Sequence, residues 1–135
     1  MKSLIVTLFC TVSLFAASSN VTQYMQTLHQ EAAVADPAFK EFNVKRGQVI
    51  FTSEHIGKKG KKIACVSCHT DNLAAKGENL FTGKVIEPLS PLANAERLSS
   101  VKEVKKWLRR NFKDVYNREG TAQEKGDVLA YIMQK

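Results

Sequence analysis

The chain has 135 residues, a length that suits one small domain rather than several. It carries 20 lysines and arginines against 13 acidic residues, which gives a formal net charge of +7. There are no internal repeats and no low-complexity tract, so repeat architectures are excluded.

The first eighteen residues have the pattern of a secretory signal. Lys2 precedes an apolar run over residues 4–15, and small residues follow at 16–18. The run is short for a transmembrane anchor, and Phe9 before Cys10 does not suit a lipoprotein site. We therefore expect a signal peptide over residues 1–18 and a periplasmic mature protein that needs no membrane surface. Nucleic acid is a poor partner for such an exported protein.

Residues 21–33 have the pattern of an amphipathic helix. Four apolar side chains recur at helical spacing, namely Val21, Tyr24, Met25 and Leu28. Asp36 and Pro37 suit a turn or a new helix start, so the first helix ends before them. We expect an N-terminal helical extension over residues 19–42, ahead of a main domain over residues 43–135.

A second helix is predicted over residues 43–56, with Asn43 as its N-cap. The side chains of its inner face are Val44, Gly47, Ile50 and Phe51. A glycine inside a helix costs about 1 kcal/mol relative to alanine. Gly47 therefore indicates a place where another backbone must come close.

The segment KKIACVSCHTDN contains the one short motif that carries chemistry. Cys65 and Cys68 flank two residues, and His69 follows directly. This is the attachment signature of c-type haem, in which the two thiols add to the haem vinyl groups as thioethers and the histidine is held beneath the iron. The motif predicts one covalently attached haem c, with His69 as the proximal ligand.

Other uses of the two cysteines are weaker. Once Cys10 leaves with the signal, Cys65 and Cys68 remain, and a disulfide across two residues would be a strained, reducible ring. A thioredoxin-like site needs a βαβ context, and no strand alternation surrounds the motif. A zinc site needs more ligands, and only His29 and His55 are left in the mature chain.

Four lysines crowd into GKKGKK, residues 57–62, directly before the haem motif. A solvated loop is the plain interpretation. Complementary charge speeds the encounter of two proteins, so we slightly favour a docking surface for an acidic redox partner.

Residues 71–98 have mostly the pattern of a loop and contain Pro88 and Pro91. A long loop in a compact domain is usually functional, and an ordered loop supplies a wall for a haem. A carbonyl at either proline is a candidate acceptor for the ring N–H of His69, which would fix the tautomer. The sequence does not choose between the two prolines, and a plain turn is the alternative.

Two further helices are predicted, over residues 99–116 and 121–134. Each begins with a capping box, and the pairs are Ser100 with Glu103 and Thr121 with Glu124. No segment alternates with period two for long, so the predicted fold class is all-α.

Asn111 lies on the inner stripe of the first of these helices, with Leu108. A buried amide without a partner costs roughly 1–3 kcal/mol, so the iron, a bound small molecule or the haem edge is a candidate partner. A helix C-cap or a backbone contact is the alternative. Nearby, Trp107 is either a haem wall or an interhelix core residue. Arg109 and Arg110 either pair with haem propionates or lie on a solvated face.

With these features the chain resembles the class I cytochromes c, over roughly residues 43–133. That family has a glycine and an aromatic residue ahead of the haem motif, as Gly47 and Phe51 stand here. Its last helix brings an aromatic residue to that glycine, a place that Tyr131 fits. The resemblance implies a class I cytochrome c fold, here with an extra N-terminal helix.

The usual sixth ligand of that family is a methionine in the loop before the last helix. In the mature chain methionine occurs only at Met25, in the first helix, and at Met133, near the chain end. An ordinary His/Met cytochrome is therefore not expected.

A narrower resemblance covers roughly residues 44–133. The stretches GKVIEPLSPLANAERLSSVKEVKKWLRRNF and REGTAQEKGDVLAYI resemble the SHP group of high-spin cytochromes c. In that group an asparagine after paired arginines is the distal ligand of ferric iron and leaves on reduction, which opens the ferrous iron to dioxygen, nitric oxide or carbon monoxide. The resemblance implies that Asn111 takes this role, while Cys65, Cys68 and His69 hold the haem.

One departure from the group concerns a disulfide. In that group a cysteine can follow the ligand asparagine, with another further along, and the two pair near the moving segment. Phe112 and Gly120 stand at these positions here. The resemblance therefore implies a distal site without disulfide control.

The expected function is an exported monohaem cytochrome c that binds a diatomic ligand once reduction has released Asn111, and that exchanges electrons with a redox partner protein. In the SHP group the donor is often a dihaem cytochrome c. Two alternatives stay open. One is a plain electron shuttle, six-coordinate in both oxidation states, with Met133, a lysine or a histidine as sixth ligand. The other is an enzyme that converts a small oxygen or nitrogen species at the open iron.

Overall fold

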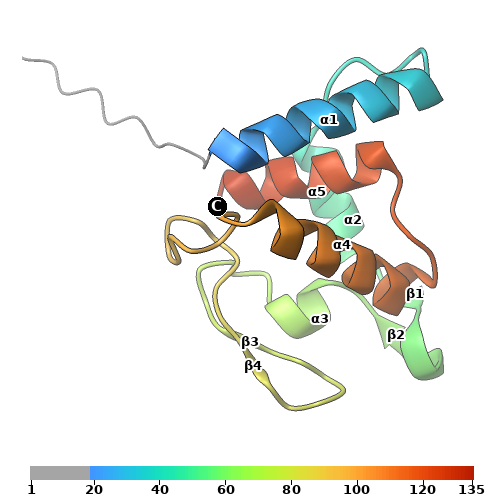
Figure 1. The fold of residues 1–135 in the computed structure, drawn as a ribbon. Helices are drawn as coiled ribbons and strands as arrows, with labels where there is room; N and C mark the ends of the chain where they lie inside the picture. Colours follow the sequence, from blue (N-terminus) through green and yellow to red (C-terminus); the bar gives the residue numbers. More distant parts are fainter. Residues whose placement is uncertain (1–18) are drawn as a thin grey trace, which may run out of the picture.

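The computed structural model describes residues 19–135 (Figure 1), so the predicted signal peptide lies outside the described residues. The helices and strands, in chain order, are α1 (Ser19–Ala35), α2 (Val44–Thr52), β1 (His55–Ile56), the 3₁₀ turn η1 (Lys58–Gly60), β2 (Lys62–Ile63), α3 (Val66–His69), β3 (Gly77–Glu78), β4 (Val85–Ile86), α4 (Val101–Tyr116) and α5 (Ala122–Met133). In this part of the chain no helix has both the length and the apolar character needed to span a membrane.

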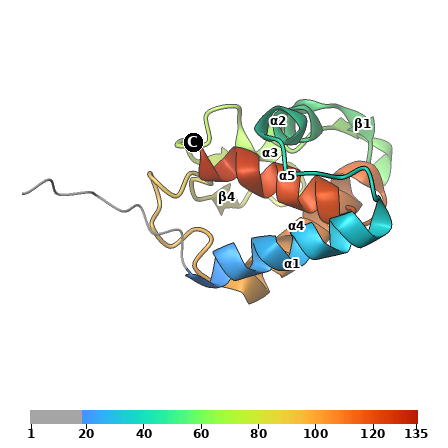
Figure 2. The ribbon, with the colours of Figure 1, turned by 90° about the horizontal axis from the view of Figure 1, so that it is seen from above.

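The helices dominate the described part of the molecule. In both Figure 1 and Figure 2, α1 runs along α5, and α2 crosses α5 from the other side. The strands are two short antiparallel pairs, β1 with β2 and β3 with β4. The all-α class predicted from the sequence is confirmed.

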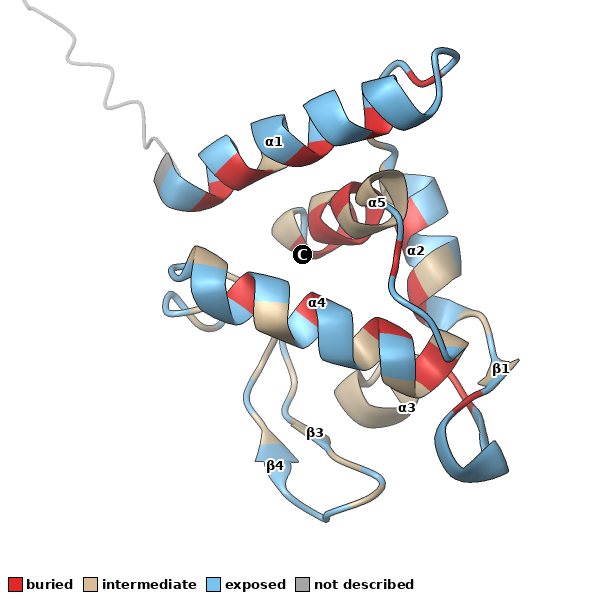
Figure 3. Ribbon diagram, turned by 45° about the vertical axis from the view of Figure 1, so that its right-hand side comes forward, coloured by how far each residue is buried: buried red, intermediate tan, exposed pale blue. Residues whose placement is uncertain are grey.

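One hydrophobic core joins the helices. Figure 3 shows the buried residues of α1, α4 and α5 on the sides that face one another. The buried cluster consists of Val21, Tyr24, Leu28, Phe51, Leu73, Val104, Leu108, Phe112, Val128, Leu129, Tyr131 and Ile132. Because three of these side chains belong to α1, the N-terminal helix packs into the same core as the helices that follow it.

The crossing of α2 and α5 is as close as the glycine in α2 predicts. A methyl group at Gly47 would collide with the backbone carbonyl of Asp127 and lie 3.0 Å from the Cβ of Tyr131. Phe51, one turn further along α2, packs on Tyr131 with ring centroids 5.6 Å apart. The expected approach of a second backbone at Gly47 is confirmed.

The predicted N-caps of α2 and α5 are present. The side chain of Asn43 accepts the backbone N–H of Arg46 at 2.9 Å. Thr121 accepts the N–H of Glu124 at 3.1 Å, and the Glu124 carboxylate accepts the N–H of Thr121 at 2.8 Å. These two bonds complete the capping box of α5.

The capping box predicted for α4 is only half formed. Ser100 accepts the N–H of Glu103 at 3.4 Å, but the Glu103 carboxylate binds Lys106 at 2.6 Å instead of returning to the cap. An ion pair between the first and second turns of α4 has replaced the second capping bond.

The second predicted helix is too long. It ends at Thr52, where the N–H of Ser53 closes the last turn on Val49, and not at residue 56. His55 and Ile56 instead form β1, which pairs with β2 across a loop closed by the N–H of Gly57 on the carbonyl of Lys61. This hairpin returns the chain toward the haem motif.

Candidate haem site

The Cys-x-x-Cys-His motif forms a single helical turn. Cys65 is the N-cap of α3, and Cys68 and His69 are its last two residues. The N–H groups of Cys68 and His69 both donate to the carbonyl of Cys65, at 3.2 and 3.1 Å. Residues three and four apart lie on one face of a helix. The turn therefore presents two thiols and an imidazole on the same side.

Two local contacts hold this turn in place. The N–H of the buried Ala64 donates to the hydroxyl of Ser67 at 2.9 Å, which fixes the entry into the turn. On the other side Gly77 of β3 packs directly on the backbone of α3. A methyl group at Gly77 would collide with the carbonyl of Cys68 and lie 3.0 Å from the Cα of His69. Sequence reasoning missed this position, for which a lone glycine in the loop was the only signal.

The two cysteines are free, half-buried thiols. Burial, and next the charge of Cys68, raises the pKa of Cys65 to about 12. A redox-active nucleophile of the thioredoxin type needs a lowered pKa instead. Within the described residues no three His, Cys, Asp or Glu side chains are gathered as a metal-ion site requires. A dithiol enzyme of the thioredoxin type therefore gains no support.

His69 offers a neutral, half-buried imidazole. Burial, and next the charge of Arg97, lowers the pKa of His69 to about 4. The neutral form is the one that binds a metal. The Nδ1 atom of His69 is buried without a hydrogen-bond partner among the described residues. Two free thiols and an imidazole with an unsatisfied nitrogen, all on one helical face, fit a covalently attached haem.

Arg97 organises the loop beside His69. It donates from Nε to the carbonyl of Pro88 at 2.7 Å and from Nη2 to the carbonyl of Glu87 at 2.6 Å. The Pro88 carbonyl is thus already engaged, and neither it nor the carbonyl of Pro91 bonds to His69. Arg97 is a second position that sequence reasoning missed, because a single arginine in a loop carries no local signal.

The same loop is pinned to the rest of the molecule at Ser90. Its N–H donates to the carbonyl of Leu73 at 2.9 Å, and its hydroxyl bonds to the carbonyl of Lys135. Ser90 is 1% exposed. The loop is therefore an ordered wall, anchored both to Leu73, after the haem motif, and to Lys135 at the end of the chain.

Asn111 lies inside α4 and not at its end. The helix continues to Tyr116 and is capped by Asn117, at φ 55°. The helix C-cap alternative for Asn111 is therefore wrong. Its side chain is half-buried between the buried Leu108 and Phe112 and makes no hydrogen bond with any described residue. An unpaired amide at the edge of the core remains available to a bound group.

The end of α4 lies close to the haem motif through Tyr116. Burial, and next the charge of Cys65, raises the pKa of Tyr116 to about 12. The hydroxyl of Tyr116 donates to the carbonyl of Ile50 at 2.6 Å, and its ring packs on His55 at 4.1 Å between centroids. α4, α2 and β1 thus meet beside Cys65.

The structure also locates Trp107, Met25 and Met133, which the sequence singled out. Trp107 is 43% exposed, so its assignment as an interhelix core residue is wrong. The cations of Lys106 and Arg110 each lie 5.1 Å from its ring. Met25 and Met133 pack against the core on α1 and α5.

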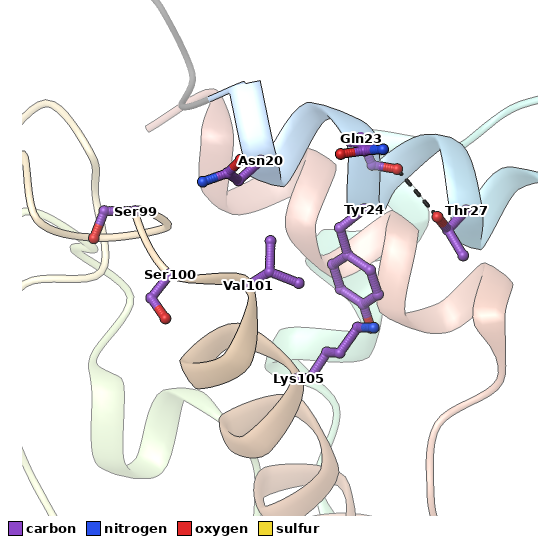
Figure 4. A pocket seen from close by; sticks show the side chains of 8 residues that line it. All are labelled: Asn20, Gln23, Tyr24, Thr27, Ser99, Ser100, Val101 and Lys105. Carbon is purple, nitrogen blue, oxygen red and sulfur yellow. Dashed lines mark hydrogen bonds between the residues drawn. The ribbon is translucent and has the colours of Figure 1, made fainter.

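Figure 4 shows a polar pocket between α1 and the start of α4. Its lining residues are Asn20, Gln23, Tyr24, Thr27, Ser99, Ser100, Val101 and Lys105. The ammonium of Lys105 lies 4.9 Å from the ring of Tyr24. None of the predicted haem residues lines this pocket, which belongs to the packing of α1 on α4.

Comparison with known proteins places this geometry in a family. Residues 37–132 match the family described as a domain of unknown function, DUF1924. Cytochrome c'' of Methylophilus methylotrophus is 30% identical over 117 residues, which cover 87% of this chain and 78% of the relative. The cytochrome c-type protein SHP of Cereibacter sphaeroides is 37% identical over 102 residues, covering 76% and 75%.

Two solved structures agree with the sequence comparison. The structure of oxidised SHP, described as an oxygen binding cytochrome c, has a TM-score of 0.74 at 30% identity and covers 85% of this chain and 96% of SHP. The solution structure of cytochrome c'' of Methylophilus methylotrophus, concerned with haem-ligand detachment, has a TM-score of 0.76 at 28% identity and covers 87% and 94%. The chain belongs to the DUF1924 family, is homologous to cytochrome c'' and SHP, and is a c-type cytochrome of the all-α class I type with one covalently bound haem c.

Proposed function

We propose that this chain is an exported cytochrome that binds a small diatomic ligand at its ferrous haem after Asn111 has left the iron, and that this binding is coupled to electron exchange. The single observation that carries the proposal is the unpaired amide of Asn111 inside α4. The similarity to SHP, described as an oxygen binding cytochrome c, supports it. The similarity to cytochrome c'', whose structure concerns haem-ligand detachment, supports it as well.

Bound haem c would supply a redox-active iron. Cys65 and Cys68 would hold it from one helical turn as thioethers, and His69, on the same face of that turn, would ligate the iron. Gly77 allows β3 to lie against the turn, which keeps these three side chains in a fixed relation.

Asn111 supplies the redox sensitivity. Its amide oxygen is a hard, weak donor that suits ferric iron better than ferrous iron. Asn111 would therefore hold ferric iron and release ferrous iron, which would leave room for dioxygen, nitric oxide or carbon monoxide. The released amide N–H would be free to donate a hydrogen bond to that ligand, while α4 is held by its packing on the core.

A second candidate function is a six-coordinate electron shuttle with His55 as the sixth ligand. It is favoured by one observation, the stacking of His55 on Tyr116, a residue close to Cys65. Met25 and Met133 are weaker candidates than His55 for the sixth ligand of such a shuttle, because both pack against the core, on α1 and α5.

We also propose the setting in which the protein acts. Residues 1–18 have the composition of a signal peptide, and this supports export to the periplasm. The redox partner is a second protein, for which a dihaem cytochrome c is the candidate implied by the resemblance to the SHP group.

The test compares two variants of the purified holoprotein by visible absorption in the ferric state. Asn111→Ala is expected to alter the ferric spectrum and leave the ferrous one nearly unchanged. His55→Ala, the matched variant, is expected to alter neither. A ferric spectrum that changes in His55→Ala and not in Asn111→Ala would replace the proposal by the shuttle.

A further inference from the structure

The loop before the haem motif gathers three lysines around one aromatic ring. The ammonium groups of Lys58, Lys59 and Lys61 lie 5.3, 5.8 and 5.7 Å from the ring centroid of Phe81. Lys59 and Lys61 are exposed, and neither has an ion-pair partner among the described residues, whereas Lys58 is paired. We call Lys58, Lys59, Lys61 and Phe81 the Lys–Phe81 patch.

The patch is fixed in place from its lysine side. Gly57 packs so closely on the end of α4 that a methyl group would collide with the carbonyl of Asp114. Lys58 pairs with the Asp114 carboxylate at 3.0 Å, and the amide of Asn117 donates to the carbonyl of Ile56 at 2.8 Å. The start of the lysine loop is therefore anchored to α4.

Phe81 is fixed from the other side, at the tip of the β3–β4 hairpin. The side-chain oxygen of Asn79 accepts the N–H groups of Phe81 and Thr82 at 2.9 and 3.1 Å. The backbone carbonyl of Asn79 accepts the N–H of Gly83 at 2.8 Å. The ring is thus presented by an ordered turn. Two loops far apart in sequence meet at this ring.

Three cations around one ring are attracted to its face but repel one another. Two of them have no anion of their own among the described residues, so an acidic surface placed over the patch would relieve the repulsion. A central aromatic ring is also a side chain that commonly anchors protein interfaces. The patch lies next to the haem motif along the chain, because Cys65 follows Lys61 by only four residues, with β2 between them.

We propose that the Lys–Phe81 patch is the docking surface for an acidic redox protein with which this cytochrome exchanges an electron. In the direction that oxidises this chain, one electron leaves its ferrous iron and reduces the redox centre of the partner, without any bond being made or broken. The proposal deepens the proposed function, since it rests on electron exchange with a protein partner. It does not depend on which ligand the ferrous iron binds.

The experiment compares two double variants of equal charge. Lys59→Glu with Lys61→Glu reverses the two unpaired cations of the patch. The control, Lys40→Glu with Lys45→Glu, makes the same change of net charge far from the patch. Lys40 lies in the α1–α2 connection and Lys45 at the start of α2. Figure 1 shows these two segments at the opposite end of the molecule from the β3–β4 hairpin. The ferrous proteins are oxidised anaerobically in a stopped-flow instrument by hexacyanoferrate(III), by the cationic complex tris(phenanthroline)cobalt(III), and by an acidic one-electron copper protein of the plastocyanin type.

We expect the patch variant to react about tenfold more slowly than the wild type with hexacyanoferrate(III) and the acidic protein at low ionic strength, and faster with the cobalt complex. The control variant should differ from the wild type by less than about twofold, and all differences should fade near 1 M salt, where the Debye length is about 3 Å. If both variants reacted equally slowly, the slower rate would be due to the change of net charge alone, and this would overturn the proposal.

Two further readouts distinguish protein docking from ligand binding and from membrane attachment. Carbon monoxide binding by each reduced variant reports on the proposed function alone, so a wild type that ignores carbon monoxide leaves the docking result valid. Co-sedimentation with phosphatidylglycerol vesicles tests an anionic membrane as the occupant. Binding that is lost in the patch variant, with unchanged oxidation kinetics, would assign the patch to a membrane and refute the docking of a redox protein.

Discussion

At the scale of single residues, a few positions hold the helices at the distances that the haem site requires. Asp127 is 1% exposed, yet its carboxylate is fully engaged: it accepts the N–H of Asn43 at 2.6 Å and two N–H groups of Arg46 at 2.8 and 3.0 Å. A buried carboxylate is tolerated when it is paired and hydrogen-bonded in this way. Asp127 thus ties the start of α2 to α5. Further along α2, the ring of Phe51 lies near that of His69.

Gly47 makes the most specific prediction at this scale. Gly47→Ala is expected to lower the free energy of unfolding by roughly 1–3 kcal/mol, because the added methyl group meets a backbone carbonyl that cannot rotate away. Urea denaturation of the holoprotein measures the change. Val49→Ala, at an exposed position of the same helix, is the control and should stay within about 0.5 kcal/mol. Equal stability of wild type and Gly47→Ala would mean that α2 and α5 do not cross as closely as described.

At the scale of elements, the end of α4 and the start of α5 are joined without a disulfide. A methyl group at Gly120 would come within 2.7 Å of the ring of Phe112, so the ring lies directly over the glycine. The resemblance to the SHP group implies that these are the two positions where that group can carry cysteines. An aromatic ring on a glycine thus closes the contact here by packing, which no reducing agent can open.

The capping box of α5 makes its start sensitive to acid. A hydrogen bond from Arg118, at 2.6–2.7 Å, is the main reason that the pKa of Glu124 is lowered from its ordinary value of 4.5. A carboxylate with a lowered pKa stabilises the fold above the unfolded value, and this stability is lost as the pH falls through the folded value. The free energy of unfolding of the wild type should therefore exceed that of Glu124→Gln by about 0.5–1 kcal/mol at pH 7. This difference should shrink as the pH falls below 4.5 and vanish once the pH is below the lowered pKa of the folded protein.

Urea denaturation of both proteins at a series of pH values measures this difference. Glu31→Gln, at an exposed position of α1, is the control and is expected to leave the free energy of unfolding within about 0.5 kcal/mol of the wild type. A gap between wild type and Glu124→Gln that widens on acidification would contradict the assignment.

At the scale of the whole molecule, α1 belongs to the same cooperative unit as the haem site. Leu28 is 1% exposed and lies in the core cluster shared by α4 and α5. Leu28→Ala should cost roughly 2–5 kcal/mol, whereas Val34→Ala, at a side chain that is 85% exposed, should cost under about 0.5 kcal/mol. Unfolding followed by both helix ellipticity and haem absorbance should shift together. A haem transition left in place by Leu28→Ala would show that α1 folds as a separate appendage.

The sequence predicted those features that depend on local chemistry. Helix periodicity predicted the four long helices, and Asn43 and Thr121 predicted the N-caps of two of them. The spacing of Cys65, Cys68 and His69 predicted the haem. Features that depend on tertiary contacts were missed. His55 and Ile56 continue a helical pattern, but Gly57 must pack on α4, and this turns the chain into a hairpin. Arg97 has no local signal and Gly77 only that of a lone glycine in a loop, since the roles of both arise from carbonyls that the fold brings to them.

The central claim is that reduction opens the distal side of the haem. The measurement that tests it most directly is the visible absorption spectrum of the dithionite-reduced holoprotein, recorded with and without carbon monoxide. We expect a high-spin ferrous spectrum that shifts on addition of the gas, because the amide of Asn111 is a poor ligand for ferrous iron. A low-spin ferrous spectrum indifferent to carbon monoxide would contradict the claim, since it would show that a strong sixth ligand stays bound in both oxidation states.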